Sequence, residues 1–249
     1  MTLKQRKVFS AALLLAGTMA FAGGHGAHWG YTGHEGPEHW GELDEKFQMC
    51  AIGLNQSPID ITSSVHANLP AIGFAYKTTP TEILNNGHTV QVNVKEGSSI
   101  TIDGHRYELK QYHFHTPSEN HIHGKEFPLE AHFVHADANG NLAVVGVMFE
   151  EGAANPELAK LWENMPMHAG DRHALHGNAA DVSNLIPSDP AYYRFNGSLT
   201  TPPCSEGVKW MVMKKTLTIS KEQVEKFAHA VHGHNNRPVQ PLDARIVVD

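Results

Sequence analysis

Three histidines in two segments of this sequence have the types and spacing of metal ligands. His113 and His115 lie two residues apart in a run of alternating character, and His132 follows in a second such run. On an extended strand alternate side chains share a face, so the first two imidazoles point the same way. If the two runs are neighbouring antiparallel strands, His132 can face this pair. Three nitrogen ligands leave one tetrahedral position open, which is the pattern of catalytic zinc.

The same alternation along the strands places further polar residues on the face of these histidines. Gln111 shares a face with His113 and His115, and Glu130 shares one with His132. Chance is the alternative, because the chain has 19 histidines and polar residues on the solvated face of a sheet are ordinary. The apolar residues that flank the pair and the acidic neighbour of His132 favour a site.

Alternating and apolar runs predict a β-rich fold around these residues. Strands are expected over residues 88–94, 99–107, 108–115, 129–136, 142–149, 192–199 and 208–214. Asp103-Gly104 and residues 137–140 predict the turns of two hairpins. Short helices are expected over residues 156–164 and 220–232, with Asn155 and Ser220 as their N-caps.

The remaining segments lack a clean period. Residues 23–50 predict an irregular arm, and residues 165–191 a long loop-rich connection. Both contain histidines that could bind a further metal ion, although a solvated surface is the alternative: His25, His28 and His34 in the arm, and His168, His173 and His176 in the loop. The sequence contains no internal repeat, coiled-coil heptad or alternation of strands with helices.

The N-terminus has the character of a secretory signal peptide. Basic residues precede an apolar run from Val8 to Met19, and Ala20-Phe21-Ala22 forms a small-x-small cleavage site. We therefore expect a signal peptide over residues 1–22, export to the periplasm or outside the cell, and a mature domain over residues 23–249. A membrane anchor is the alternative, but the run is short and no second apolar segment follows it.

Composition and charge narrow the functional classes. The 249 residues are 41% hydrophobic and 18% charged, which suits one large or two small globular domains. Removing the three basic residues of the leader leaves 16 of 19 basic against 26 acidic residues, a net charge of −10 with neutral histidines. This acidic balance argues against binding to nucleic acid, and no membrane span is expected after signal removal.

Two cysteines, Cys50 and Cys204, are present in a chain expected to be exported. An even count in an oxidising compartment favours one disulfide. Two free thiols or a thiolate metal site are the alternatives, although the spacing is not that of a Cys-x-x-Cys motif.

With these elements placed, the sequence resembles the α-class carbonic anhydrases from about Trp29 to Leu242. The motifs that carry the resemblance, in order, are Gln56-Ser57-Pro58-Ile59-Asp60, Asn86-Gly87-His88, Gln111-Tyr112-His113-Phe114-His115, Ser118-Glu119, Glu130-Ala131-His132, Gly197-Ser198-Leu199-Thr200-Thr201-Pro202-Pro203 and Arg237-Pro238-Val239-Gln240-Pro241-Leu242. Thr116-Pro117 and Ala136 depart from the pattern of animal relatives. The resemblance implies a single, mainly β domain of the α+β class, with a large, twisted, mostly antiparallel central sheet and a few short peripheral helices.

The resemblance also implies a chemistry, the reversible hydration of CO2 to bicarbonate and a proton. One Zn²⁺ per chain would be held by the three histidines, and zinc-bound hydroxide would attack carbon. Thr200 would accept a hydrogen bond from this hydroxide and donate one to an ionised Glu119. Gln111 and Glu130 would orient ligand rings, and a backbone carbonyl would orient the ring of His115.

Further roles follow from the resemblance alone. His88 matches the proton shuttle, and the residues that would order its waters are Tyr31, Asn86 and Gln91. The apolar substrate pocket corresponds to Val134, Val144, Leu199, Thr201, Val208 and Trp210. Cys50 and Cys204 match the disulfide of exported bacterial members, and cis peptide bonds are expected before Pro58 and Pro203.

Family-level expectations are a weak esterase side activity, inhibition by sulfonamides and anions, and a homodimer. The competing functions on the same fold are a non-catalytic binding protein and a periplasmic metal buffer that uses the many histidines.

Overall fold

The computed structural model describes residues 27–177 and 180–249. The predicted signal peptide and His25 lie outside these residues. The described residues contain one sheet of 11 strands and a separate parallel pair. The strands of the large sheet are β2 (Gly73–Ala75), β3 (Pro80–Asn85), β4 (Val90–Val94), β5 (Ser99–Ile102), β6 (His105–His115), β8 (Leu129–Ala136), β9 (Leu142–Glu151), β10 (Arg172–Ala174), β11 (Tyr192–Ser198), β12 (Glu206–Met213) and β13 (Leu217–Ile219). The pair consists of β1 (Asp60–Ile61) and β7 (His121–Ile122).

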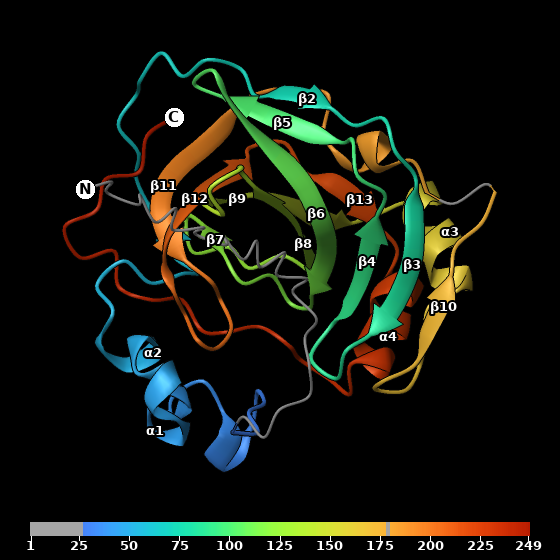
Figure 1. Cartoon of the computed structure of the whole chain (residues 1–249), viewed down its shortest axis with the longest axis horizontal. Coiled ribbons are helices and arrows are strands. Elements are labelled where there is room, and N and C mark those ends of the chain that lie inside the picture. Colours follow the sequence, from blue (N-terminus) through green and yellow to red (C-terminus); the bar gives the residue numbers. More distant parts are fainter. Residues whose placement is uncertain (1–26, 178–179) are drawn as a thin grey trace, which may run out of the picture.

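The large sheet is twisted and mostly antiparallel, as expected (Figure 1). Its strands follow the order β10-β3-β4-β6-β8-β9-β12-β11, with β13 beside β9 and β5 beside β6. Only the pairings of β12 and β13 with β9 are parallel within it. Strand β9 is therefore hydrogen-bonded to β8 on one edge and to β12 and β13 on the other, which explains its nearly continuous apolar sequence.

The two predicted hairpins are present. Asp103 and Gly104 both have positive φ values, 52° and 78°, as a tight turn between β5 and β6 requires. The expected break between residues 107 and 108 is wrong, because β6 continues from His105 to His115 without interruption. In the second hairpin the Asp137 side chain accepts hydrogen bonds from the backbone N–H groups of Asn139 and Asn141.

Two longer helices pack beside the sheet. Helix α3 (Pro156–Glu163) is capped by Asn155, whose side chain accepts from two backbone N–H groups. Helix α4 (Lys221–Ala230) begins with a capping box between Ser220 and Gln223. The predicted end at His232 is wrong: the helix ends at Ala230, and His232 leaves it in the left-handed region, with φ of 61°.

The segments expected to be irregular contain short elements. The arm forms η1 (Gly33–Glu35), α1 (Trp40–Leu43), η2 (Glu45–Phe47) and α2 (Met49–Ile52), and the later loop contains β10 and η3 (Val182–Leu185). A four-residue helix is too short to show a 3.6-residue period, so the sequence pattern did not predict these elements. Trp40 anchors the arm: it is fully buried, and its indole N–H lies 2.9 Å from the Gly30 carbonyl oxygen.

The two faces of the sheet have different partners. On one face, Tyr112, Phe114 and Phe133 belong to the main hydrophobic core together with residues of α3 and α4. Side chains alternate along a strand, so the intervening His113 and His115 face the other way. A second apolar cluster, which includes Val144 and Trp210, lies on that opposite face. The sheet thus separates an apolar core from the face that carries the histidines.

The expected disulfide and the two expected cis peptide bonds are present. Cys50 and Cys204 form a disulfide, which excludes both free thiols and a thiolate metal site. The bonds Ser57-Pro58 and Pro202-Pro203 are cis, and Thr116-Pro117 is a third cis bond that was not expected. Among the described residues, no helix has the length and apolar character needed to cross a membrane.

The disulfide should stabilise the fold. It closes a loop with a sequence separation of 154, so its loss should lower the free energy of unfolding by about 2–5 kcal/mol. Urea titration of the Cys50→Ser/Cys204→Ser double variant measures this difference. Reductant should destabilise the wild type and leave the double variant unchanged; equal stability of both proteins would contradict the expectation.

Candidate metal centre

The three predicted ligands converge. Strands β6 and β8 pair antiparallel with His113 directly opposite His132, while His115 is two residues further along β6. One nitrogen from each ring can be chosen so that all three lie within 4.8 Å of one another. Among residues 27–177 and 180–249, this is the single group of three or more potential ligands that meets this criterion. The other histidines considered in the sequence do not assemble a second centre in this part of the chain.

Each imidazole has one nitrogen close to an oxygen of a neighbouring residue. His113 Nδ1 lies 2.9 Å from Gln111 Oε1, and His132 Nε2 lies 2.9 Å from Glu130 Oε1. His115 Nδ1 lies 2.7 Å from the carbonyl oxygen of Asn235. His113 Nδ1 and His115 Nδ1 can donate their ring protons to these oxygens, and a ring proton on His132 Nε2 would face the Glu130 carboxylate. These tautomers leave His113 Nε2, His115 Nε2 and His132 Nδ1 as lone-pair donors.

These donors fit a zinc ion. His115 Nε2 is buried and has no hydrogen-bond partner among the described residues. Burial lowers the pKa of His115 to about 4 and holds the pKa values of His113 and His132 well below their usual range. All three rings are therefore neutral at pH 7, which is the protonation state that binds metal.

Glu130 accepts several hydrogen bonds beside His132. Its carboxylate accepts hydrogen bonds of 2.8 Å from the backbone N–H of Glu119, the backbone N–H of Asn120 and the Asn120 side chain. Gly146 lies opposite His132 on β9, and a Cβ atom added there would lie 2.9 Å from Glu130 Oε1. A glycine at this position therefore lets the carboxylate reach His132.

Glu119 and Thr200 lie close enough for the Thr200 hydroxyl to influence the pKa of the Glu119 carboxyl. Both are buried, and Glu119 Oε2 lies 3.5 Å from His115 Nε2. Burial raises the pKa of Glu119 well above its usual range, whereas the Arg237 N–H and the Thr200 hydroxyl lower it. A dication at the three histidines would act in the same direction as these donors and favour the ionised carboxylate.

Arg237 was missed as a functional candidate, although it belongs to one of the recognised motifs. Its backbone N–H donates to Glu119 Oε1 at 2.9 Å. Its buried guanidinium donates to Gln56 Oε1, Ser57 O and Cys50 O at 2.9, 2.7 and 3.1 Å. These partners are 180 or more residues away in sequence, apart from Glu119 at 118, so no local pattern could have revealed them.

An apolar wall adjoins the histidines. Val134 is opposite Val144, which is in turn opposite Trp210, so the three side chains share the histidine face of neighbouring strands. The rings of His132 and Trp210 meet edge to face with centroids 4.8 Å apart. Five of the six predicted pocket residues belong to this one cluster: Val134, Val144, Leu199, Val208 and Trp210. Thr201 lies in the adjoining turn, where its carbonyl accepts from the Cys204 N–H at 2.8 Å.

His88 lies outside the ligand group and stacks on Trp29, with ring centroids 3.7 Å apart. Burial, assisted by the nearby His28, lowers its pKa below the usual value. The Asn86 side-chain oxygen caps the turn by accepting from the His88 and Thr89 N–H groups.

The other two residues predicted to order water are Gln91 and Tyr31. Gln91 is opposite His113 on β4, and its amide donates to Asn93 Oδ1 at 2.8 Å. The Tyr31 hydroxyl is buried and has no partner among the described residues. It can therefore bind a water molecule, whereas one donor of Gln91 is already in use.

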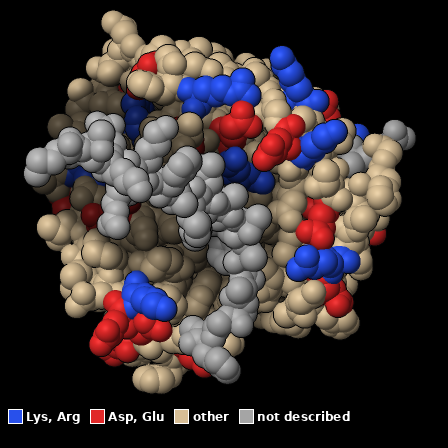
Figure 2. Space-filling view, in the orientation of Figure 1, with Lys and Arg blue, Asp and Glu red and all other residues tan. Residues whose placement is uncertain are grey.

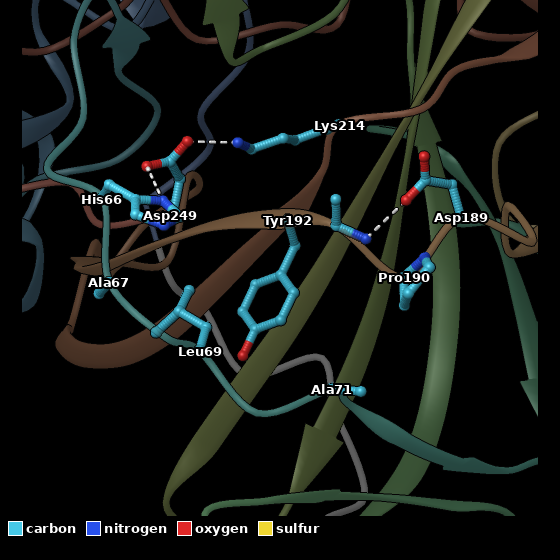
Figure 3. A pocket seen from close by; sticks show the side chains of 10 residues that line it. His66, Ala67, Leu69, Ala71, Asp189, Pro190, Tyr192, Lys214 and Asp249 are labelled. Atoms are coloured by element: carbon cyan, nitrogen blue, oxygen red, sulfur yellow. Dashed lines mark hydrogen bonds and ion pairs between the residues drawn. The ribbon is translucent and has the colours of Figure 1, made fainter.

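A surface pocket lies apart from the three histidines. A pocket of about 280 Å³ lies beside Tyr192, where Lys214 forms an ion pair with Asp249, the last residue of the chain (Figure 3). None of its lining residues belongs to the metal centre. On the face shown in Figure 2, acidic and basic side chains lie in mixed groups.

Comparisons with known proteins agree with this geometry. The profile of the family described as eukaryotic-type carbonic anhydrase matches residues 35–249. A carbonic anhydrase of Neisseria gonorrhoeae is 51% identical over 243 residues, covering 96% of each chain. One from Klebsiella pneumoniae is 48% identical, covering 96% of this chain and 97% of the relative.

A solved structure supports the fold directly. The α-carbonic anhydrase of Thermovibrio ammonificans, in complex with the inhibitor sulfanilamide, has a TM-score of 0.87 and 51% identity, covering 90% of this chain and all of that one. The family profile, which matches residues 35–249, includes the strands that carry the three histidines and the rest of the sheet. The chain therefore belongs to the α-class carbonic anhydrases, a family of enzymes.

Proposed function

We propose that this enzyme catalyses the reversible hydration of CO2 to bicarbonate and a proton, using one zinc ion held by His113, His115 and His132. The observation that carries the proposal is the convergence of three imidazoles from β6 and β8, with His113 directly opposite His132. When bound, zinc with three such ligands lowers the pKa of water to about 7, a value established on carbonic anhydrases themselves, and supplies the nucleophile.

Thr200 and Glu119 orient the attack. An ionised carboxylate can only accept hydrogen bonds, so Glu119 fixes the Thr200 hydroxyl as a donor toward itself. The Thr200 oxygen is then left to accept a hydrogen bond from the nucleophile, whose lone pair is aimed at the carbon of CO2. Arg237 supports this arrangement because its backbone N–H holds the other oxygen of Glu119.

The apolar wall provides the substrate site. CO2 has no net dipole, so Val144, Val208 and Trp210 bind it without competing for the polar groups of the centre. Their burial excludes water from the carbon while leaving the metal side polar. The predicted esterase side activity uses the same nucleophile. Sulfonamide binding is proposed because the Thermovibrio relative was solved with sulfanilamide.

His88 transfers the product proton to buffer. Its lowered pKa keeps it neutral at pH 7 and ready to accept a proton. It stands outside the ligand group, so the proton reaches it through water held by groups such as the Tyr31 hydroxyl. The Trp29 ring supports His88 in a position from which it can release the proton to solvent.

We also propose export through the signal peptide at residues 1–22. The disulfide between Cys50 and Cys204 supports this, because such bonds persist in oxidising compartments. The mature chain would then act in the periplasm or outside the cell. Edman sequencing of exported protein should begin at Gly23, and retention of Met1 would refute the assignment.

Metal content separates the enzyme from a metal buffer. After dialysis, elemental analysis of the mature protein should give one zinc per chain, because the described residues assemble one ligand group. His132→Ala should lose most of this zinc, while His173→Ala, a matched change at an exposed position of β10, should retain it. Several tightly bound equivalents, or one equivalent in His132→Ala, would contradict the assigned centre.

Thr200 can be tested independently of metal binding. Thr200→Ala should lower kcat/KM for CO2 hydration about 100-fold, because the nucleophile is no longer oriented. Thr200→Ser, which restores the hydroxyl, should recover most of the activity, and both variants should keep one zinc. Stopped-flow hydration assays measure the rates; full activity in Thr200→Ala would exclude the orienting role.

The proton shuttle predicts a dependence on buffer. His88→Ala should lower kcat at least about tenfold in dilute buffer, and added imidazole should restore part of the loss, because it replaces the missing base. His105→Ala, at the distant exposed start of β6, is the control. If His88→Ala had the wild-type kcat in dilute buffer and gained nothing from imidazole, the shuttle assignment would be wrong.

A further inference from the structure

Asn235 is a buried side chain to which sequence analysis gave no role. Its exposed fraction is 1%, and all of its polar groups are used. Its backbone carbonyl accepts from His115 Nδ1 at 2.7 Å, and its backbone N–H donates to Thr116 O at 3.1 Å. Its side-chain oxygen accepts from Thr116 N at 2.8 Å, while Nδ2 donates to His88 O and Phe114 O, each at 3.0 Å.

The carbonyl contact with His115 is part of the metal centre already described; beyond it, we propose that the Asn235 side chain is a positioning group that ties the shuttle turn at His88 to that carbonyl and to the ligand strand. This inference rests on the proposed function of both histidines. The carbonyl of Asn235 orients the ligand ring, and its side chain fixes both that carbonyl and the backbone of His88. The two functional groups therefore share one support.

The chemistry of the site requires an asparagine. One short side chain must accept from an N–H and donate to two carbonyl oxygens, and the primary amide provides both functions. Aspartate would keep the acceptor but place a charged oxygen against the carbonyls of His88 and Phe114. Glutamine is one methylene longer, and the site is fully buried.

The neighbouring contacts show that the His88 turn is attached to the ligand strand. Phe114, whose carbonyl receives Asn235 Nδ2, lies between His113 and His115 on β6. Thr89 Oγ1 donates to the same carbonyl at 2.5 Å. Thr89 anchors the turn, but its hydrogen bonds do not reach a ligand ring, whereas Asn235 contacts both the His88 backbone and the ring of His115.

Two variants of Asn235 separate its interactions. Asn235→Ala removes all three side-chain hydrogen bonds and keeps the backbone carbonyl. Asn235→Asp keeps the shape and the acceptor for Thr116 N but removes both donors. Asn236→Ala is the matched control, because that side chain is only half-buried and its amide lies 3.5 Å from Ser118 O.

The readouts are the zinc dissociation rate into excess chelator, the turnover in dilute and concentrated buffer, and the melting temperature. We expect both Asn235 variants to release zinc about tenfold faster, the lower range for loss of a group that orients a metal ligand. Their turnover should fall more in dilute than in concentrated buffer. Asn236→Ala should match wild type in all measurements.

A double variant tests whether the second effect passes through His88. In the His88→Ala background, Asn235→Asp should still accelerate zinc release but cause no further loss of turnover in dilute buffer. The proposal would be overturned if both Asn235 variants released zinc and depended on buffer as the wild type does. It would also be overturned if only one of these two properties, zinc release or buffer dependence, changed. If Asn235→Ala does not fold, the isosteric Asn235→Asp decides.

Failure of the proposed function is recognised separately. An unaltered buffer dependence in His88→Ala alone would refute the shuttle, and absence of zinc from the wild type would refute the metal centre. Neither result involves a change at Asn235. A melting temperature that falls without faster zinc release assigns Asn235 a structural role only and contradicts the proposal.

Discussion

The register between β6 and β8 is the constraint on which the rest of the structure depends. It places His113 opposite His132 and puts the three imidazoles on one face, with Tyr112 and Phe114 packed into the core on the other. A slip of one residue would exchange these faces and bury the ligands in the apolar core. The aromatic residues between the histidines thus contribute to the site indirectly, because their burial keeps the register fixed.

The centre is completed by segments that are distant in sequence. Glu130 comes from β8 itself, but Asn235 and Arg237 belong to the extended segment after α4 and contact His115 and Glu119 from there. The guanidinium of Arg237 donates to the carbonyl oxygens of Cys50 and Ser57. The disulfide joins Cys50 to Cys204, which lies beside the loop that carries Thr200. His115, Glu119 and the loop that carries Thr200 are therefore connected through buried hydrogen bonds and the disulfide.

Local patterns predicted the parts of the fold and site that rest on local physics. Alternation in β6 and β8 predicted the shared face of His113 and His115, and turn residues predicted both hairpins. Asn155 and Ser220 predicted the helix starts, whereas the end of α4 depends on the left-handed His232, which has no strong local signal. Asn235 and Gly146 escaped prediction, because their importance arises from contacts across the fold. The roles of Thr200, Glu119 and His88 came from family resemblance, since a threonine before proline is ordinarily a turn residue.

The proposed centre binds one metal ion through three imidazoles and leaves a fourth position open. A crystal structure of the zinc-loaded mature protein would show this coordination. We expect His113 Nε2, His115 Nε2 and His132 Nδ1 at about 2.0–2.1 Å from zinc, with a solvent oxygen or inhibitor atom in the fourth position. A fourth protein ligand, a carboxylate in place of one imidazole, or zinc bound at other histidines would contradict it.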